Sequence, residues 1–74
     1  MERQRYEVIF EFDAVEQNNR SGVLFRVVPP IAIFADTEVP GVVRFTFEGN
    51  ASTWLVDSAT FTRCTRPAPL ISDI

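Results

Sequence analysis

The chain has 74 residues, a formal net charge of −3, 46% hydrophobic residues and seven Phe. This length allows one domain near the lower limit for a self-sufficient core, and the apolar content excludes a disordered segment. All seven basic residues are Arg and are interleaved with acids along the sequence, which disfavours a basic stripe and predicts no nucleic-acid partner.

Short extended segments follow one another along the chain. The clearest is residues 42–47, where apolar and polar residues alternate with the period of two that is typical of a half-buried strand. Residues 6–12 alternate in the same way, except at Ile9. The predicted strands, in chain order, are residues 6–12, 23–28, 31–35, 42–47, 54–56 and 59–63.

Turn-forming residues separate these segments. Residues 14–22 become polar and predict a hairpin-type loop, although residues 13–17 can also hold one helical turn. Pro29-Pro30 ends the second strand at a bend, Pro40-Gly41 suits a type II turn, and Gly49-Asn50 closes the fourth strand. No segment keeps a period of 3.6 residues for three turns, so we expect no long helix.

Short strands between regular turn signals predict an all-β fold. We expect a small antiparallel sandwich or partly open barrel of roughly five to six short strands. Residues 1–66 would form this domain, with Trp54, Val56 and Phe61 in its core, and residues 67–74 would form an extended C-terminal tail.

Several features occur in an order that is informative as a set. They are the alternating N-terminal strand, the strand running into Pro29-Pro30, the Pro40-Gly41 turn with the strand after it, and Trp54 followed by Ala59-Thr60-Phe61. In this order the chain resembles small, uncharacterised bacterial β-sandwich proteins of immunoglobulin-like or cupredoxin-like outline. The resemblance implies a fold and no activity, and it implies further strands after the segment that matches Phe61, which this chain lacks.

A sandwich without its last strands would leave an open sheet edge and an uncovered apolar face, so the resemblance predicts self-association. Two chains would pair sheets face to face, or the tail of one chain would add to a neighbour's sheet edge. Apolar residues that break the inward pattern would form a second face, with arginines pairing at its rim. The alternative is a complete barrel with a disordered tail. The interface candidates are Ile9, Leu24, Phe34, Arg26, Arg44, Leu70, Ile71 and Ile74.

The residues that most catalytic and metal sites use are scarce. Cys64 is the only cysteine and there is no His, which excludes an intramolecular disulfide, a zinc cluster and the usual base of nucleophilic catalysis. Arg63 and Arg66 flank Cys64 and could activate it, but an ordinary thiol is the simpler interpretation. Carboxylate pairs such as Asp13 with Glu16 lack calcium-loop spacing. We predict no enzyme, no cofactor and no metal.

The N-terminal residues are polar, and no run approaches the roughly 18 apolar residues of a membrane span. We therefore expect no membrane partner and a cytoplasmic location. The most fitting function is a non-enzymatic module for self-association or protein–protein interaction, with a homo-oligomer or another protein as partner. The alternatives are a small acidic inhibitor of the phage type that occludes a basic surface of a larger machine, and a binder of a small apolar ligand.

Overall fold

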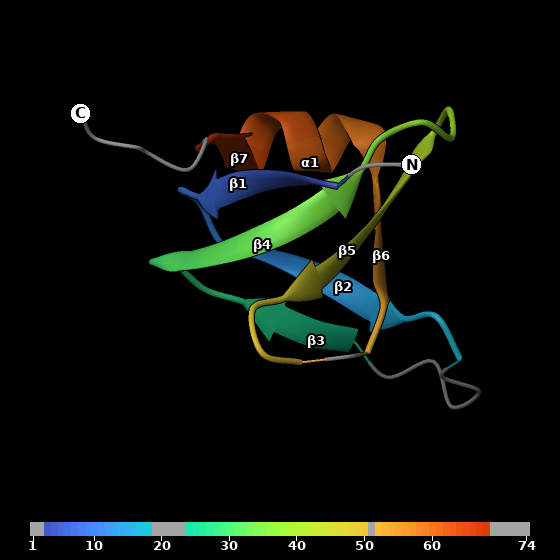
Figure 1. The fold of residues 1–74 in the computed structure, drawn as a ribbon, viewed down its shortest axis with the longest axis horizontal. Helices are drawn as coiled ribbons and strands as arrows, with labels where there is room; N and C mark the ends of the chain where they lie inside the picture. Colours follow the sequence, from blue (N-terminus) through green and yellow to red (C-terminus); the bar gives the residue numbers. More distant parts are fainter. Residues whose placement is uncertain (1–2, 19–23, 51, 69–74) are drawn as a thin grey trace.

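The computed structural model describes residues 3–18, 24–50 and 52–68. Within these residues, seven strands form one antiparallel sheet that curls into a half-barrel, and one short helix, α1, accompanies it (Figure 1). The all-β prediction is confirmed, in its partly open form. The elements are β1 Gln4–Val8, β2 Phe12–Glu16, β3 Leu24–Val27, β4 Ile31–Asp36, β5 Val42–Phe47, β6 Trp54–Asp57, α1 Ser58–Cys64 and β7 Thr65–Pro67.

The order of strands across the sheet is β3-β2-β6-β5-β4-β1-β7. Three pairs, β2 with β3, β4 with β5 and β5 with β6, are neighbours both in sequence and in the sheet. The pairing of β1 with β4 and of β7 with β1 joins segments that are distant in sequence. The first and last strands of the chain therefore lie side by side, and β3, from the interior of the sequence, forms one edge of the described sheet.

The expected strand over residues 6–12 is in fact two strands, and this prediction was wrong. β1 ends at Val8 and β2 begins at Phe12, and the two lie in different parts of the sheet. Between them, the N–H groups of Ile9 and Phe10 both donate to the carbonyl oxygen of Cys64, at 2.8 and 3.2 Å. Apolar and polar residues alternate in both β1 and β2. In the sequence, only Ile9 departs from this alternation and marks the connection between the two strands.

The expected strand over residues 59–63 is also wrong, because Ser58–Cys64 forms α1. Asp57 caps this helix, and one of its carboxylate oxygens accepts a hydrogen bond from the N–H of Thr60 at 2.9 Å. Phe61 and Cys64 lie one turn apart and are both buried. Packing of this helical face against β5, β6 and β7 overrides the preference of the threonines and Phe61 for extended structure.

Most predicted turns are confirmed. Gly41 and Gly49 both have positive φ, +86° and +79°, which L side chains adopt only with strain. Asn50 accepts a hydrogen bond from the N–H of Ser52 at 2.8 Å, as in an Asx turn. Residues 14–16, expected in a loop or a helical turn, belong to β2 instead, and residues 19–23 of that loop lie outside the described residues.

The core lies on the inner, concave face of the sheet and is closed by α1. Val56 and Phe61 are buried as predicted, while Trp54 is only partly buried and packs against the core. Pro67, expected to begin the tail, ends β7, and residues 69–74 lie outside the described residues. The buried apolar residues are Val8, Phe12, Ala14, Val27, Ile33, Ala35, Val43, Phe45, Val56, Phe61 and Cys64.

Candidate functional site

The edge strand β3 is one of the two strands of the described sheet that pair on one side only. It pairs with β2 on one side, and among the described residues no strand pairs with its other side. The opposite edge, β7, has three residues and includes Pro67, which has no N–H to offer to a further strand. Of the two edges in the described part of the sheet, β3 is therefore the one free of proline, the kind of edge that templates pairing with another chain.

Exposed apolar side chains concentrate at this edge. Leu24 is 60% exposed and Phe25 is 46% exposed, although β3 is only four residues long. Val28 comes directly after β3, and Ile31 begins β4. Together with Phe25 they line a groove of about 290 Å³. The exposed large hydrophobic residues of the described chain are Phe10, Leu24, Phe25, Val28, Ile31 and Val39.

On the inner face, Phe25 is the exposed end of an aromatic cluster. Its ring centroid lies 5.1 Å from that of Trp54 and 5.9 Å from that of Phe47. The indole Nε1 of Trp54 is buried and has no acceptor among the described residues. Phe25 thus points to the inner face, but its position on the edge strand leaves its side chain 46% exposed.

On the outer face, which is the side of the sheet turned away from the core, an apolar row continues inward from the edge. Leu24 lies opposite Val15, and Val15 lies opposite Leu55 on β6. These side chains, with Val42 on the next strand, border a groove of about 360 Å³. The edge strand is therefore apolar on both faces.

Arg26 supplies the charge of β3. On the outer face its Nε lies 2.7 Å from Asp13 and its Nη1 lies 3.2 Å from Glu11. The hydrogen bond to Asp13, followed by the charges of Asp13 and Glu11, raises the pKa of Arg26 above its ordinary value. All three side chains are exposed, so the pairing orients Arg26 more than it stabilises the fold.

Arg44, the other candidate arginine, belongs to a different part of the outer face. Its Nη2 lies 3.2 Å from Asp36, whose side chain is only 3% exposed. The N–H of Glu38 donates to the same carboxylate at 3.0 Å, and this bond, followed by the Arg44 guanidinium, lowers the pKa of Asp36 despite its desolvation. Arg44 therefore joins β5 to the start of the turn after β4.

The structure does not bring the apolar candidates together into one face. Leu24 and Phe34 both point outward, but β2, β6 and β5 lie between their strands. Ile9 lies in the crossing between β1 and β2, beside Cys64. The prediction that these residues form a second apolar face is therefore wrong. The alternation of residues along a strand shows the side of the sheet to which each residue points, but it does not show the order of the strands. Leu70, Ile71 and Ile74 lie outside the described residues.

Cys64 is buried, with 4% exposure, and its thiol lies 3.8 Å from the carbonyl oxygen of Glu11. It forms part of the floor of a groove of about 630 Å³ between residues 10–13 and α1, with Phe10 and Arg63 among the lining residues. Within the described part of the chain, no three His, Cys, Asp or Glu side chains group as metal ligands. The one described helix, of seven residues, is far too short to cross a bilayer.

No protein-family model, curated protein or solved structure matches this chain. The resemblance to small bacterial β-sandwich proteins therefore stays a prediction. The resemblance placed the open sheet edge after Phe61, and the structure places it elsewhere. The segment after Phe61 supplies β7, which pairs with β1, and the open edge is β3 rather than a place left by missing final strands.

Proposed function

We propose that the chain is a non-enzymatic self-association module in which the β3 edges of two copies pair. The observation that carries this proposal is the outer edge of β3, which no described strand covers and which is flanked by exposed Leu24 and Phe25. A free edge with apolar side chains on both faces is stabilised when a second strand covers it. The expected cytoplasmic location stays a prediction from the sequence.

The sequence of β3 favours one register for this pairing. Antiparallel strands related by a two-fold axis normal to the sheet place residues of the same face opposite each other. Centring the axis on Phe25 puts its ring next to Phe25 of the partner subunit and puts Leu24 opposite Arg26 of the partner subunit. Centring it on Arg26 would place two like charges opposite each other, which is unfavourable.

The expected affinity is modest. β3 contributes only four residues, so the edge itself buries little area compared with the roughly 1,200 Å² or more of a stable specific interface. Val28 and Ile31, which are exposed beside the edge, extend the apolar contact on the inner side. We therefore expect a dimer with a dissociation constant on the order of micromolar rather than nanomolar.

Light scattering after gel filtration tests the proposal, with protein loaded from low micromolar to near-millimolar concentration. The wild type should approach twice the chain mass of 8.4 kDa, while Leu24→Lys, which places a charge at the edge, should stay monomeric. The matched control is Val39→Lys, at an exposed apolar residue in the turn before β5, which should behave as the wild type. A monomeric wild type, or a Leu24→Lys variant that dimerises equally well, would overturn the proposal.

A further inference from the structure

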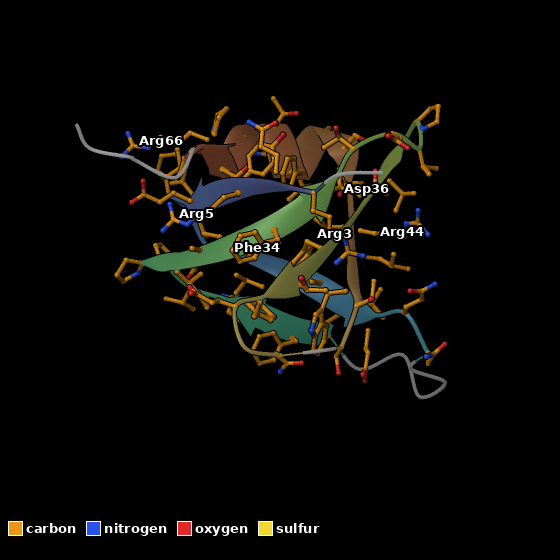
Figure 2. The ribbon with its side chains drawn as sticks, in the orientation of Figure 1. Arg3, Arg5, Phe34, Asp36, Arg44 and Arg66 are labelled. Carbon is orange, nitrogen blue, oxygen red and sulfur yellow. The ribbon has the colours of Figure 1, made fainter. Side chains whose placement is uncertain are left out.

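A second surface lies on the outer face of β5, β4, β1 and β7, away from the β3 edge. Strand pairing places Phe34 between Thr46 on β5 and Arg5 on β1. In Figure 2, labelled arginines lie along both sides of β4 around Phe34. The arginines of this surface, named here the arginine face, are Arg3, Arg5, Arg44 and Arg66.

Arg3 and Arg5 are close in the sequence, but Arg44 and Arg66 are distant from them, which is why the sequence shows no basic stripe. The sheet gathers them because β1 pairs with both β4 and β7, and β4 pairs with β5. Arg26 and Arg63 lie elsewhere, on β3 and α1. The cationic character of this face is thus a product of topology and not of local composition.

Two of these arginines are neutralised by carboxylates. Arg44 is paired with Asp36, and Arg66 places its Nη2 at 3.0 Å and its Nε at 3.2 Å from the same oxygen of Glu7. Both carboxylates belong to the strands that form the arginine face. Arg44 and Arg66 therefore add little net charge to it.

The other two arginines contact neutral acceptors. Nη1 of Arg3 donates to the Thr46 hydroxyl at 3.2 Å, and Nη1 of Arg5 donates to the carbonyl oxygen of Ala68 at 3.0 Å. Among the described residues, neither guanidinium lies within ion-pairing distance of a carboxylate. Arg3 does help to lower the pKa of Asp36, but that carboxylate is already bonded to Arg44. Within the described part of the chain, Arg3 and Arg5 therefore keep cationic charges that a ligand can pair with.

The spacing of these two charges defines what fits them. The two side chains extend in opposite directions: Arg3 reaches Thr46 on β5, across β4, whereas Arg5 reaches Ala68, which follows β7 on the other side of β1. Phe34 on β4 therefore lies between the two guanidinium groups (Figure 2). Guanidinium and carboxylate groups form short, charge-assisted and often bidentate hydrogen bonds. Phe34, opposite Arg5, offers an apolar contact beside the charges.

We propose that the arginine face binds a short, extended acidic segment of a partner protein, which lies across β4 with one carboxylate on Arg3, another on Arg5 and an intervening side chain against Phe34. A nucleic acid fits less well, because phosphate-backbone binding commonly uses about six to ten cationic contacts, and on this face only Arg3 and Arg5 lack a carboxylate partner among the described residues. A long polyanion would also meet Glu7 and the other acids of a chain with net charge −3.

A titration followed by amide chemical shifts tests this proposal, with hexaglutamate as the probe and hexaglutamine as the uncharged control. Hexaglutamate should cause saturable shifts at Arg3, Arg5, Phe34 and Thr46, and hexaglutamine should not. Arg5→Gln should weaken binding at least about threefold, as expected for one exposed ion pair, and the charge-matched Arg63→Gln on α1 should leave it unchanged. Arg3→Gln, at an exposed residue, replaces Arg5→Gln if the latter perturbs the fold.

Several outcomes would overturn the proposal. These are no saturable shift with hexaglutamate, equal shifts with hexaglutamine, equal weakening by Arg63→Gln, and tighter binding of hexathymidylate, which would make a nucleic acid the occupant. Arg5→Gln should leave the oligomeric state unchanged, because the arginine face and β3 lie in different parts of the sheet. Failure of acidic-segment binding is therefore distinguishable from failure of edge pairing.

Discussion

The ring of Phe25, on the edge strand, packs against the ring of Trp54, with centroids 5.1 Å apart and planes inclined at 37°. This contact joins the edge strand to the aromatic part of the core. Trp54 is the only tryptophan, so its fluorescence reports directly on the environment of the proposed pairing strand. The Phe25 side chain thus packs on the core with one side, and in the proposed pairing its uncovered side contacts the partner.

Replacing Phe25 with Ala should destabilise the fold and alter the fluorescence of Trp54. A half-exposed Phe should cost less than the 3–5 kcal/mol of a buried one, so we expect a loss of about 2 kcal/mol in the free energy of unfolding. Urea unfolding followed by Trp54 emission at low protein concentration measures this loss. Leu24→Ala, which removes an exposed side chain of the same strand, should change stability little, and an equal loss in both variants would contradict the role of the Phe25–Trp54 contact.

Removing the cap of α1 should lower the melting temperature. Asp57 accepts a hydrogen bond from the N–H of Thr60, and loss of such a cap by Asp57→Ala should lower Tm by about 4 to 8 °C. Asp57→Asn keeps an acceptor oxygen and should retain most of the stability. Thermal unfolding followed by circular dichroism compares the two variants, and a Tm of Asp57→Asn equal to that of Asp57→Ala would show that capping is not the cause.

The stability of the fold should decrease in acid. The pKa of Asp36 is lowered by the N–H of Glu38 and by Arg44, and the pKa of Asp57 is lowered by the hydroxyl and N–H of Thr60. A carboxyl with a lowered folded-state pKa stabilises the fold above its unfolded pKa of about 3.9, and this stabilisation is lost as the pH falls through the folded-state value.

Melting temperatures at about pH 6 and pH 3 measure this effect. The wild type should be less stable at the lower pH, and Asp36→Asn should reduce the difference because it removes one of the titrating groups. A wild type equally stable at both values, or an Asp36→Asn variant with an unchanged difference, would contradict the assignment.

Cys64 should react slowly in the folded protein. Its side chain is buried at the end of α1, so alkylation requires the helix to open. We expect iodoacetamide to modify the native protein at least about tenfold more slowly than the urea-unfolded chain, as for a buried structural thiol. Mass spectrometry of timed samples gives both rates. Equal rates would mean that the thiol is accessible in the native state.

The strand at residues 42–47 was predictable because its alternation of apolar and polar residues records a burial pattern that the sheet then reproduces. Residues 6–12 show the limit of such alternation, since two strands in different parts of the sheet gave one continuous pattern. Residues 59–63 show another limit. Their β-forming side chains favoured a strand, and Asp57, a residue type that commonly caps helix N-termini, was the local signal for a helix.

The candidate surfaces were less predictable, because both depend on pairing between distant segments. Leu24 was singled out from its parity, but Val15 and Leu55 join it only through the order β3-β2-β6. Arg5 and Phe34 are neighbours only because β1 pairs with β4. A local pattern of residue types determines neither the order of the strands nor which strand lies at the edge of the sheet. The exposure of Phe25 therefore could not be predicted from the sequence.

The most direct test of pairing through β3 is an isotope-filtered nuclear Overhauser spectrum of a sample that mixes labelled and unlabelled chains at near-millimolar concentration. Paired β3 edges predict cross-peaks between chains that involve Phe25 of both subunits and join Leu24 to Arg26 of the partner subunit. A dimer whose interchain cross-peaks come only from other strands, or a sample that gives none, would contradict self-association through this edge.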